Sequence, residues 1–318
     1  VERMLRLGGT KVEVGVQTTY DEINRDMHRG HGVDASLDAN RRLRDAGFKV
    51  GFHMMPGQPG MTEAMSREDF RRLFGEPDWR PDYLKIYPTL VVRGTRVYDM
   101  WQRDEFEPLD NEAAAELVAE IKRDLPRYVR LQRVQRDIPA DFIDGGVWKS
   151  NLRQLARERM AERGWTCDCI RCREVGMNDE EPEDVELEVL TYDAAGGTEH
   201  FISFEDFGKD LLVGFARLRF PGQPVRRELQ DAALLRELHV YGSEVGLAGA
   251  DGRGEEDGDG RDWQHRGYGK RLMAEAEALA ADAGYERLAV ISGIGARQYY
   301  REQLGYHQDG PYVVKRLR

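Results

Sequence analysis

The stretches ELHVYG (residues 237–242) and WQHRGYGKRLMAEAEALA (residues 263–280) decide the fold of the C-terminal part of this chain. The first is typical of a β-strand, and the second places two glycines just before a helical pattern. Glycine lets backbone N–H groups approach a ligand closely, and the first turn of a helix offers unpaired N–H groups and a positive dipole end. This combination predicts a phosphate-binding turn, and a turn that merely begins a helix is the alternative. The residues of the turn are Gln264, Arg266, Gly267, Tyr268, Gly269 and Lys270.

The rest of the chain predicts two kinds of architecture. Between residues 10 and 139, strand-like runs alternate with helical ones, which is typical of a parallel sheet with crossover helices. The helix within 32–48 is predicted to begin at Ser36 and to end at Gly47, and a second helix begins at Asp110 or Asn111. After an acidic, proline-containing linker, antiparallel strands and a βαβα pattern predict an α+β domain at the C-terminus.

Composition excludes several classes of protein. The net charge of −11 argues against a chain that is basic throughout, although residues 121–175 carry 13 Lys or Arg against 8 Asp or Glu. No apolar run approaches the roughly 18 residues that a membrane span needs, and the first residues show no apolar signal core. We therefore expect a cytoplasmic protein with no membrane association.

All three cysteines lie in the hexapeptide CDCIRC as Cys167, Cys169 and Cys172. Thiols this close in an intracellular protein favour a structural metal, most often zinc, over a disulfide framework. Zinc takes four ligands, so a histidine from elsewhere or Asp168 is needed to complete the set. Three reduced thiols without a metal are the alternative.

Longer motifs carry a resemblance to a known family. VGVQTTYDEINRDMHRGH, FHMMPGQPG, LKIYPTLVVRGT and RVQRDIP, followed by ELHVYG, QHRGYG, AVISGIGARQYYREQLGY and DGPYVVK, closely resemble the catalytic subunit of Elongator in its archaeal form. The resemblance runs from about residue 8 to the C-terminus. It implies the C-terminal portion of a radical S-adenosylmethionine (SAM) partial barrel at 1–145, a zinc-binding linker at 146–178 and a GCN5-related N-acetyltransferase domain at 179–318.

The resemblance assigns roles in the acetyltransferase domain. It implies that acetyl-CoA places its pyrophosphate on the glycine turn and its pantetheine arm along the preceding strand. A tyrosine of the later helix then protonates the leaving thiolate; Tyr300 is preferred and Tyr299 is the alternative. The strand residues are Glu237, Leu238, His239 and Val240.

In the barrel, the resemblance implies that Glu13, Gln17, His53 and Lys85 line the interior, with Gln17 assigned to the cofactor. The family uses SAM and a [4Fe–4S] cluster held by three cysteines in the N-terminal half of the barrel. These cysteines are absent here, so we expect the chain to correspond to the C-terminal two-thirds of such an enzyme and not to generate the radical itself.

The family's function is modification of C5 of the wobble uridine in tRNA, which makes the tRNA anticodon stem–loop the expected partner. A homodimer, or a separate N-terminal radical SAM segment, is a further expected partner. Two alternatives remain: an N-acetyltransferase of a protein lysine or small amine, and a tRNA-binding partner without catalysis. The first needs a general base near the acetyl group; Glu237 and His239 lie within the strand, but neither is a compelling base. The alternative to RNA binding by the arginines that flank the cysteines is solvated helix faces paired with glutamate. For residues 153–163 alone the two are balanced, and the resemblance favours a tRNA-binding surface. The candidate RNA-binding arginines are Arg123, Arg127, Arg130, Arg133, Arg136, Arg153, Arg157, Arg159, Arg163, Arg171 and Arg173.

Overall fold

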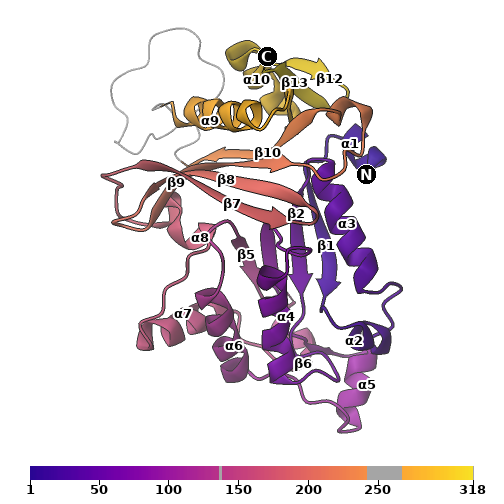
Figure 1. Cartoon of the computed structure of the whole chain (residues 1–318). Coiled ribbons are helices and arrows are strands. Elements are labelled where there is room, and N and C mark those ends of the chain that lie inside the picture. Colours follow the sequence, from indigo (N-terminus) through magenta and orange to yellow (C-terminus); the bar gives the residue numbers. More distant parts are fainter. Residues whose placement is uncertain (136–137, 242–266, 318) are drawn as a thin grey trace. The chain divides into compact units, whose positions relative to one another are not determined.

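The computed structural model describes residues 1–135, 138–241 and 267–317 (Figure 1). The chain divides into two compact units. Unit 1 comprises Val1–Thr10, Arg42–Lys49 and Arg171–Arg318, and unit 2 comprises Lys11–Arg41 and Val50–Ile170. The predicted limits of the three parts, at 145/146 and 178/179, stay a prediction.

Unit 2 is built on a four-stranded sheet with the order β1-β2-β3-β5. β2, β3 and β5 pair in parallel, as the alternation of strands and helices predicts. The elements up to residue 162 are α1 (Glu2–Arg6), β1 (Lys11–Gln17), α2 (Asp21–Asp26), α3 (Val33–Asp45), β2 (Lys49–Met54), α4 (Glu63–Gly75), β3 (Tyr83–Ile86), β4 (Val91–Val92), α5 (Arg96–Gln102), α6 (Asn111–Arg123), β5 (Arg130–Val134), β6 (Ile143–Gly145) and α7 (Leu152–Glu162).

Helix boundaries follow their capping groups. The prediction that Ser36 caps α3 is wrong, because the helix begins three residues earlier and the carboxylate of Asp21 accepts a hydrogen bond from the Val33 N–H at 2.8 Å. The predicted end at Gly47 is confirmed: its φ of +93° is the left-handed conformation that ends helices. The predicted cap at Asp110 is also confirmed, since its carboxylate accepts the Ala113 N–H at 2.8 Å.

The two faces of this sheet differ in chemistry because side chains alternate along each strand. Phe52, Leu84 and Ile86 point to one face and are fully buried. His53 and Lys85 point to the other face, where the parallel register places them side by side. Polar residues at alternate positions therefore share one surface of the sheet.

Unit 1 is built on a seven-stranded sheet with the order β12-β13-β11-β10-β9-β8-β7. Most neighbours are antiparallel, but β10 and β11 are parallel. The elements from residue 170 onward are α8 (Ile170–Arg173), β7 (Glu186–Ala194), β8 (Gly197–Asp206), β9 (Leu211–Phe220), β10 (Ala232–Val240), α9 (Tyr268–Asp282), β11 (Arg287–Val290), α10 (Arg297–Leu304), β12 (His307–Asp309) and β13 (Tyr312–Arg316).

The main core of unit 1 lies between this sheet and helix α9, which packs on β8, β9 and β10 (Figure 1). Leu272, Met273 and Ala276 of α9 contribute to it together with Leu235 and Leu288 from the strands, and all five are almost completely buried. Burial of these side chains fixes the start of α9 relative to the end of β10.

A second buried region of unit 1 is ionic. Glu199 on β8 accepts hydrogen bonds from Arg44 at 2.9 Å, from Arg219 at 3.0 Å and from Arg236 at 2.7 Å. Arg219 also binds Asp45 at 2.7 Å. All five side chains are at most 1% exposed. Sequence reasoning missed this network, which ties the end of α3 to three strands of the sheet.

Among the described helices, none combines the length and apolar character needed to cross a bilayer.

Candidate functional site

The first candidate site lies where β10 separates from β11. The parallel register of these strands runs from Ala232 to Leu235, whereas pairing of β10 with β9 continues to Val240. The β10–β9 register shifts between Leu235 and Glu237, which marks a β-bulge. Beyond the bulge β10 diverges from β11, and the side chains of Leu238 and Val240 pack toward the core.

The glycine turn meets the end of this strand. Gly267 has a φ of +76° and precedes α9, which begins at Tyr268. A β-carbon on Gly269 would lie 3.9 Å from Val240 Cγ2 and 3.5 Å from the Tyr299 hydroxyl. The structure thus brings together three predicted elements: the strand, the turn and one of the two tyrosines. Gln264 and Arg266 lie outside the described residues, and Lys270 is in the first turn of α9.

The two candidate tyrosines occupy different environments on α10. Tyr300 is 6% exposed, belongs to the hydrophobic core and packs against the ring of Tyr306 with centroids 5.9 Å apart. Burial, with a smaller effect of Tyr299, raises the pKa of Tyr300 well above its usual range. Tyr299 is half-buried, and burial also raises its pKa. It is the hydroxyl of Tyr299 that lies beside Gly269.

The opposite face of β10 carries the two bases that sequence reasoning considered. Glu237 accepts a hydrogen bond from Arg217 Nε at 2.9 Å. The guanidinium of Arg217 lies over the rings of Phe201 and Phe215, 5.3 and 5.2 Å from their centroids. His239 packs against Phe215, with ring centroids 6.0 Å apart. The carboxylate of Glu237 is therefore engaged in an ion pair. Sequence reasoning missed Arg217, because an arginine inside a strand pattern carries no signal of its own.

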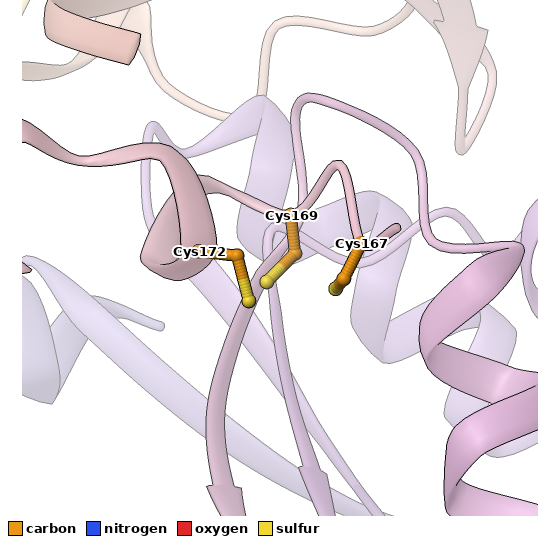
Figure 2. A group of neighbouring side chains, drawn as sticks. All are labelled: Cys167, Cys169 and Cys172. Atoms are coloured by element: carbon orange, nitrogen blue, oxygen red, sulfur yellow. The ribbon is translucent and has the colours of Figure 1, made fainter. Parts of the chain in front are cut away.

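The cysteine segment forms a second candidate site. The sulfur atoms of Cys167, Cys169 and Cys172 all lie within 4.8 Å of one another. Figure 2 shows Cys172 on α8 and the other two on the loop that precedes it. Among the described residues, no carboxylate or imidazole atom belongs to this group, so Asp168 is not part of it. Three thiolates at this spacing suit a soft metal ion such as zinc.

The polar face of the sheet in unit 2 forms a third candidate site. Glu13 on β1 contacts His53 Nε2 at 2.8 Å, Lys85 Nζ at 2.5 Å and Lys11 Nζ at 3.3 Å. Burial acts to raise the pKa of Glu13, but the hydrogen bonds from Lys85 and His53 and the charge of Lys11 together lower it to about 2. Four residues were predicted to line the interior of the barrel. One of them, Glu13, thus contacts two of the others, His53 and Lys85.

Gln17, the fourth predicted interior residue, ends β1 on the same face. Its φ is +70°, and its side-chain amide nitrogen lies 2.7 Å from the position that a β-carbon on Gly15 would take. Among the described residues no hydrogen-bond partner is found for its buried Oε1 atom. A strained backbone and an unsatisfied buried acceptor are both typical of ligand-binding positions.

The candidate RNA-binding arginines do not form one free surface. Arg173 is 1% exposed and binds Glu205 at 2.7 Å, so the prediction that it contacts RNA is wrong. Arg163 binds Glu116 at 2.5 Å and lies over the ring of Trp165, as does Arg123. These contacts support the alternative that helix surfaces pair their charges. Arg136 lies outside the described residues.

Comparison with known proteins accounts for the whole chain. The family model for the radical SAM superfamily matches residues 1–73, that for the Radical_SAM C-terminal domain matches 81–162, and that for the acetyltransferase (GNAT) family matches 166–306. The solved structure of the archaeal Elp3 of Methanocaldococcus infernus with an N-terminal deletion is 44% identical, has a TM-score of 0.92, and is matched over 99% of this chain and 74% of that one.

The chain belongs to the Elongator complex protein 3 family. A tRNA uridine(34) acetyltransferase of the same archaeon is 45% identical over 327 residues, which cover 100% of this chain and 59% of the relative. Elongator complex protein 3 of Saccharomyces cerevisiae is 43% identical over 326 residues, with 100% and 57% covered. The chain therefore spans somewhat more than half the length of these relatives. Membership confirms the predicted fold class, a radical SAM portion followed by a Cys-rich segment and a GNAT domain.

Proposed function

We propose that this chain is part of an enzyme that uses acetyl-CoA to modify C5 of the wobble uridine in tRNA. Two kinds of support exist. The printed names of relatives that align with the whole chain include tRNA uridine(34) acetyltransferase. The structural observation that carries the acetyl-CoA part is the convergence of Val240, Gly269 and the Tyr299 hydroxyl where β10 diverges from β11.

Each part of this site has a role in the proposal. The N–H groups at the start of α9, from Gly267 to Lys270, bind the pyrophosphate, because a glycine turn and a helix N-terminus both favour anions. The backbone of β10 beyond its bulge, at residues 237–240, pairs with the amide groups of the pantetheine arm. The absence of a side chain on Gly269 leaves room beside the Tyr299 hydroxyl.

In the proposed reaction, water attacks the acetyl carbonyl and the carbon–sulfur bond breaks. Tyr299 donates its hydroxyl proton to the leaving thiolate and recovers one proton from the attacking water. Acetic acid and the free thiol of CoA result, and the acid releases its remaining proton to solvent to give acetate. A tyrosine suits this task because its ordinary pKa of about 10 already keeps the hydroxyl protonated at neutral pH. Burial raises the pKa of Tyr299 further. Tyr300, the preferred candidate from sequence, has its ring packed in the core.

The unit 2 sheet fits a SAM-binding role. Its family models belong to the radical SAM superfamily, which implies SAM and an iron–sulfur cluster. When bound, these groups supply carbon-radical chemistry. Gln17 would hold SAM through its unsatisfied Oε1, while Glu13, His53 and Lys85 would present a fixed set of charges to the same face. Cluster ligands are not assigned to residues of this chain.

We further propose that Cys167, Cys169 and Cys172 bind zinc. Tetrahedral coordination with Zn–S bonds of about 2.3 Å places thiolate sulfurs about 3.8 Å apart. The observed group, with all sulfurs within 4.8 Å, needs little adjustment to reach that geometry. The three thiolates supply three of the four ligands that structural zinc takes.

The tRNA anticodon stem–loop is the proposed partner, and the cytoplasm is the proposed location because tRNA modification of this type acts on a cytoplasmic substrate. A homodimer, or a separate N-terminal radical SAM segment, stays a prediction. The alternative of a lysine or amine N-acetyltransferase is not favoured. It needs a general base near the acetyl group, and one of the two residues considered for this role, Glu237, has its carboxylate bound by Arg217.

The test is acetyl-CoA hydrolysis by the chain, with and without tRNA that carries uridine at the wobble position. We expect tRNA to raise the rate and Tyr299→Phe to abolish it, whereas Tyr300→Phe, which keeps its ring in the core, retains most of it. Equal rates with and without RNA, together with acetylation of amines, would replace the proposal by the plain acetyltransferase. Loss of activity in Tyr300→Phe with none in Tyr299→Phe would reverse the assignment of the two tyrosines.

A further inference from the structure

Two buried oxygen atoms at the carboxyl ends of β3 and β5 have no assigned role. Gln135 directly follows β5, is 8% exposed and has a φ of +71°. Thr89 follows β3 and is 3% exposed. In the part of the chain that the structure describes, neither Gln135 Oε1 nor Thr89 Oγ1 has a hydrogen-bond partner. Buried polar atoms are nearly always satisfied, so such a pair points to a ligand.

Both residues lie against the same short segment after β6. The side-chain amide of Gln135 donates to the Val147 carbonyl at 3.4 Å. A β-carbon on Gly146 would lie 3.1 Å from the Thr89 carbonyl oxygen, and Gly146 has a φ of +99°. Because the amide nitrogen of Gln135 is held by Val147, its oxygen is oriented as an acceptor. The loops after β3, β5 and β6 therefore meet at residues 146–147.

An exposed aromatic ring follows this segment. Trp148 is 58% exposed, although tryptophan is usually mostly buried. The ammonium of Lys149 lies 5.9 Å from the centroid of its ring. The Lys149 N–H donates to Asn111 Oδ1 at 3.2 Å, which ties the backbone after Trp148 to the start of α6. An exposed ring beside a cation is the arrangement on which single-stranded nucleic acids stack their bases.

From this juxtaposition we propose that Thr89, Gln135 and Trp148 form a subsite that reads the uracil base of the RNA substrate. This inference rests on the proposed function. Gln135 Oε1 accepts the N3–H of uracil, and the free hydrogen of its amide donates to O2. Thr89 supplies a further hydroxyl at the base edge, and Trp148 stacks on the target base or its neighbour.

The chemistry of uracil explains why this edge is the one to read. C5 lies across the ring from C2, so contacts to N3 and O2 leave C5 open to reaction. Cytosine has an acceptor instead of a donor at N3, which would face the fixed acceptor of Gln135. The carboxyl ends of parallel strands are also where open α/β sheets bind their ligands. A protein partner would not need two buried polar atoms beside the exposed ring.

The test measures binding of a labelled anticodon stem–loop RNA to the chain by fluorescence anisotropy. We expect Trp148→Ala to weaken binding by about tenfold, the usual effect of losing one stacked base, and Trp148→Phe to retain most of the affinity. Phe207→Ala, which removes a ring that is 47% exposed in unit 1, is the matched control and should leave binding unchanged. Trp148 is exposed, so its replacement does not endanger folding.

Base reading is tested by changing the RNA. Replacing the wobble uridine by 3-methyluridine, which lacks the N3–H, should weaken binding to the wild type about fivefold or more. The same replacement should have no effect on Gln135→Leu, since the acceptor is gone. Equal affinities of the wild type, Trp148→Ala and Gln135→Leu for all RNAs would overturn the inference and leave the proposed function standing. Loss of SAM binding instead of RNA binding in Gln135→Leu would also overturn it, and no RNA binding by the wild type would refute both.

Discussion

Replacing Glu199 by glutamine should destabilise unit 1 severely. The side chain is 1% exposed, and its two oxygens accept hydrogen bonds from Arg44, Arg219 and Arg236. Glutamine has nearly the same shape but no charge, and its NH2 group would face a guanidinium instead of accepting from it. The three arginines would keep their positive charges without the carboxylate that binds them together.

The magnitude follows from the burial of this network. Breaking a buried ion pair by removing one partner costs about 3–5 kcal/mol, because the remaining charge stays desolvated. The carbonyls of Phe48 and Ala194, which accept from Arg236 and Arg219, reduce this penalty only in part. For a unit of this size each kcal/mol lowers the melting temperature by about 2–4 °C. We therefore expect the melting temperature of unit 1 to fall by about 6–20 °C.

The assay is thermal and urea unfolding of the purified chain, followed by circular dichroism. The matched control is Glu188→Gln, the same exchange on β7, where the side chain is exposed. That variant should differ from wild type by less than about 0.5 kcal/mol. If Glu199→Gln unfolds at the same temperature as Glu188→Gln, the reasoning that the network stabilises unit 1 is wrong.

Three further predictions concern the candidate sites. The pKa of Glu13 in the folded chain is about 2, below its ordinary 4.5, so the residue adds stability above pH 4.5 that is lost as pH falls toward 2. The urea midpoints measured at about pH 6 and about pH 3 should therefore differ less in Glu13→Gln than in the wild type. An unchanged difference between the two midpoints would contradict this. Gly269→Ala should fold normally, since its methyl group meets neighbours at ordinary contact distances, but should bind acetyl-CoA more weakly in calorimetry because it fills space beside Tyr299; unchanged affinity would place the ligand elsewhere. Metal analysis should find one zinc per chain, lost in Cys172→Ser and removed by a chelator with a fall in melting temperature; a metal-free wild type of equal stability would refute the zinc site.

Much of the candidate acetyl-CoA site was accessible from sequence because its parts are local. A strand, a glycine pair and a helix start are each encoded by a few neighbouring residues, and the structure places Gly267 and α9 where the pattern predicted them. The choice between Tyr299 and Tyr300 was different. Adjacent positions on a helix point about 100° apart, so the packing of α10 decides which hydroxyl lies beside Gly269 and which ring is buried.

The start of α3 also depends on a residue distant in the chain, so it could not be predicted from the local sequence. Ser36 is a good capping residue by type, yet the helix begins at Val33 because Asp21, twelve residues earlier, accepts the bond from its N–H. The capping preference of a single residue contributes about 1 kcal/mol to helix stability, and a tertiary contact can outweigh that contribution.

The sequence by itself determined the succession of strands and helices, the clustering of three cysteines and the membership of a family, because these depend on periodicity, spacing and motifs along the chain. Only the tertiary structure decided that Glu13 joins His53 with Lys85 and that Arg173 is buried on Glu205. It also decided that the loops carrying the two unsatisfied oxygens meet at residues 146–147, next to an exposed tryptophan. These arrangements depend on distances between residues far apart in the chain, and such distances exist only after strands pair and side chains pack.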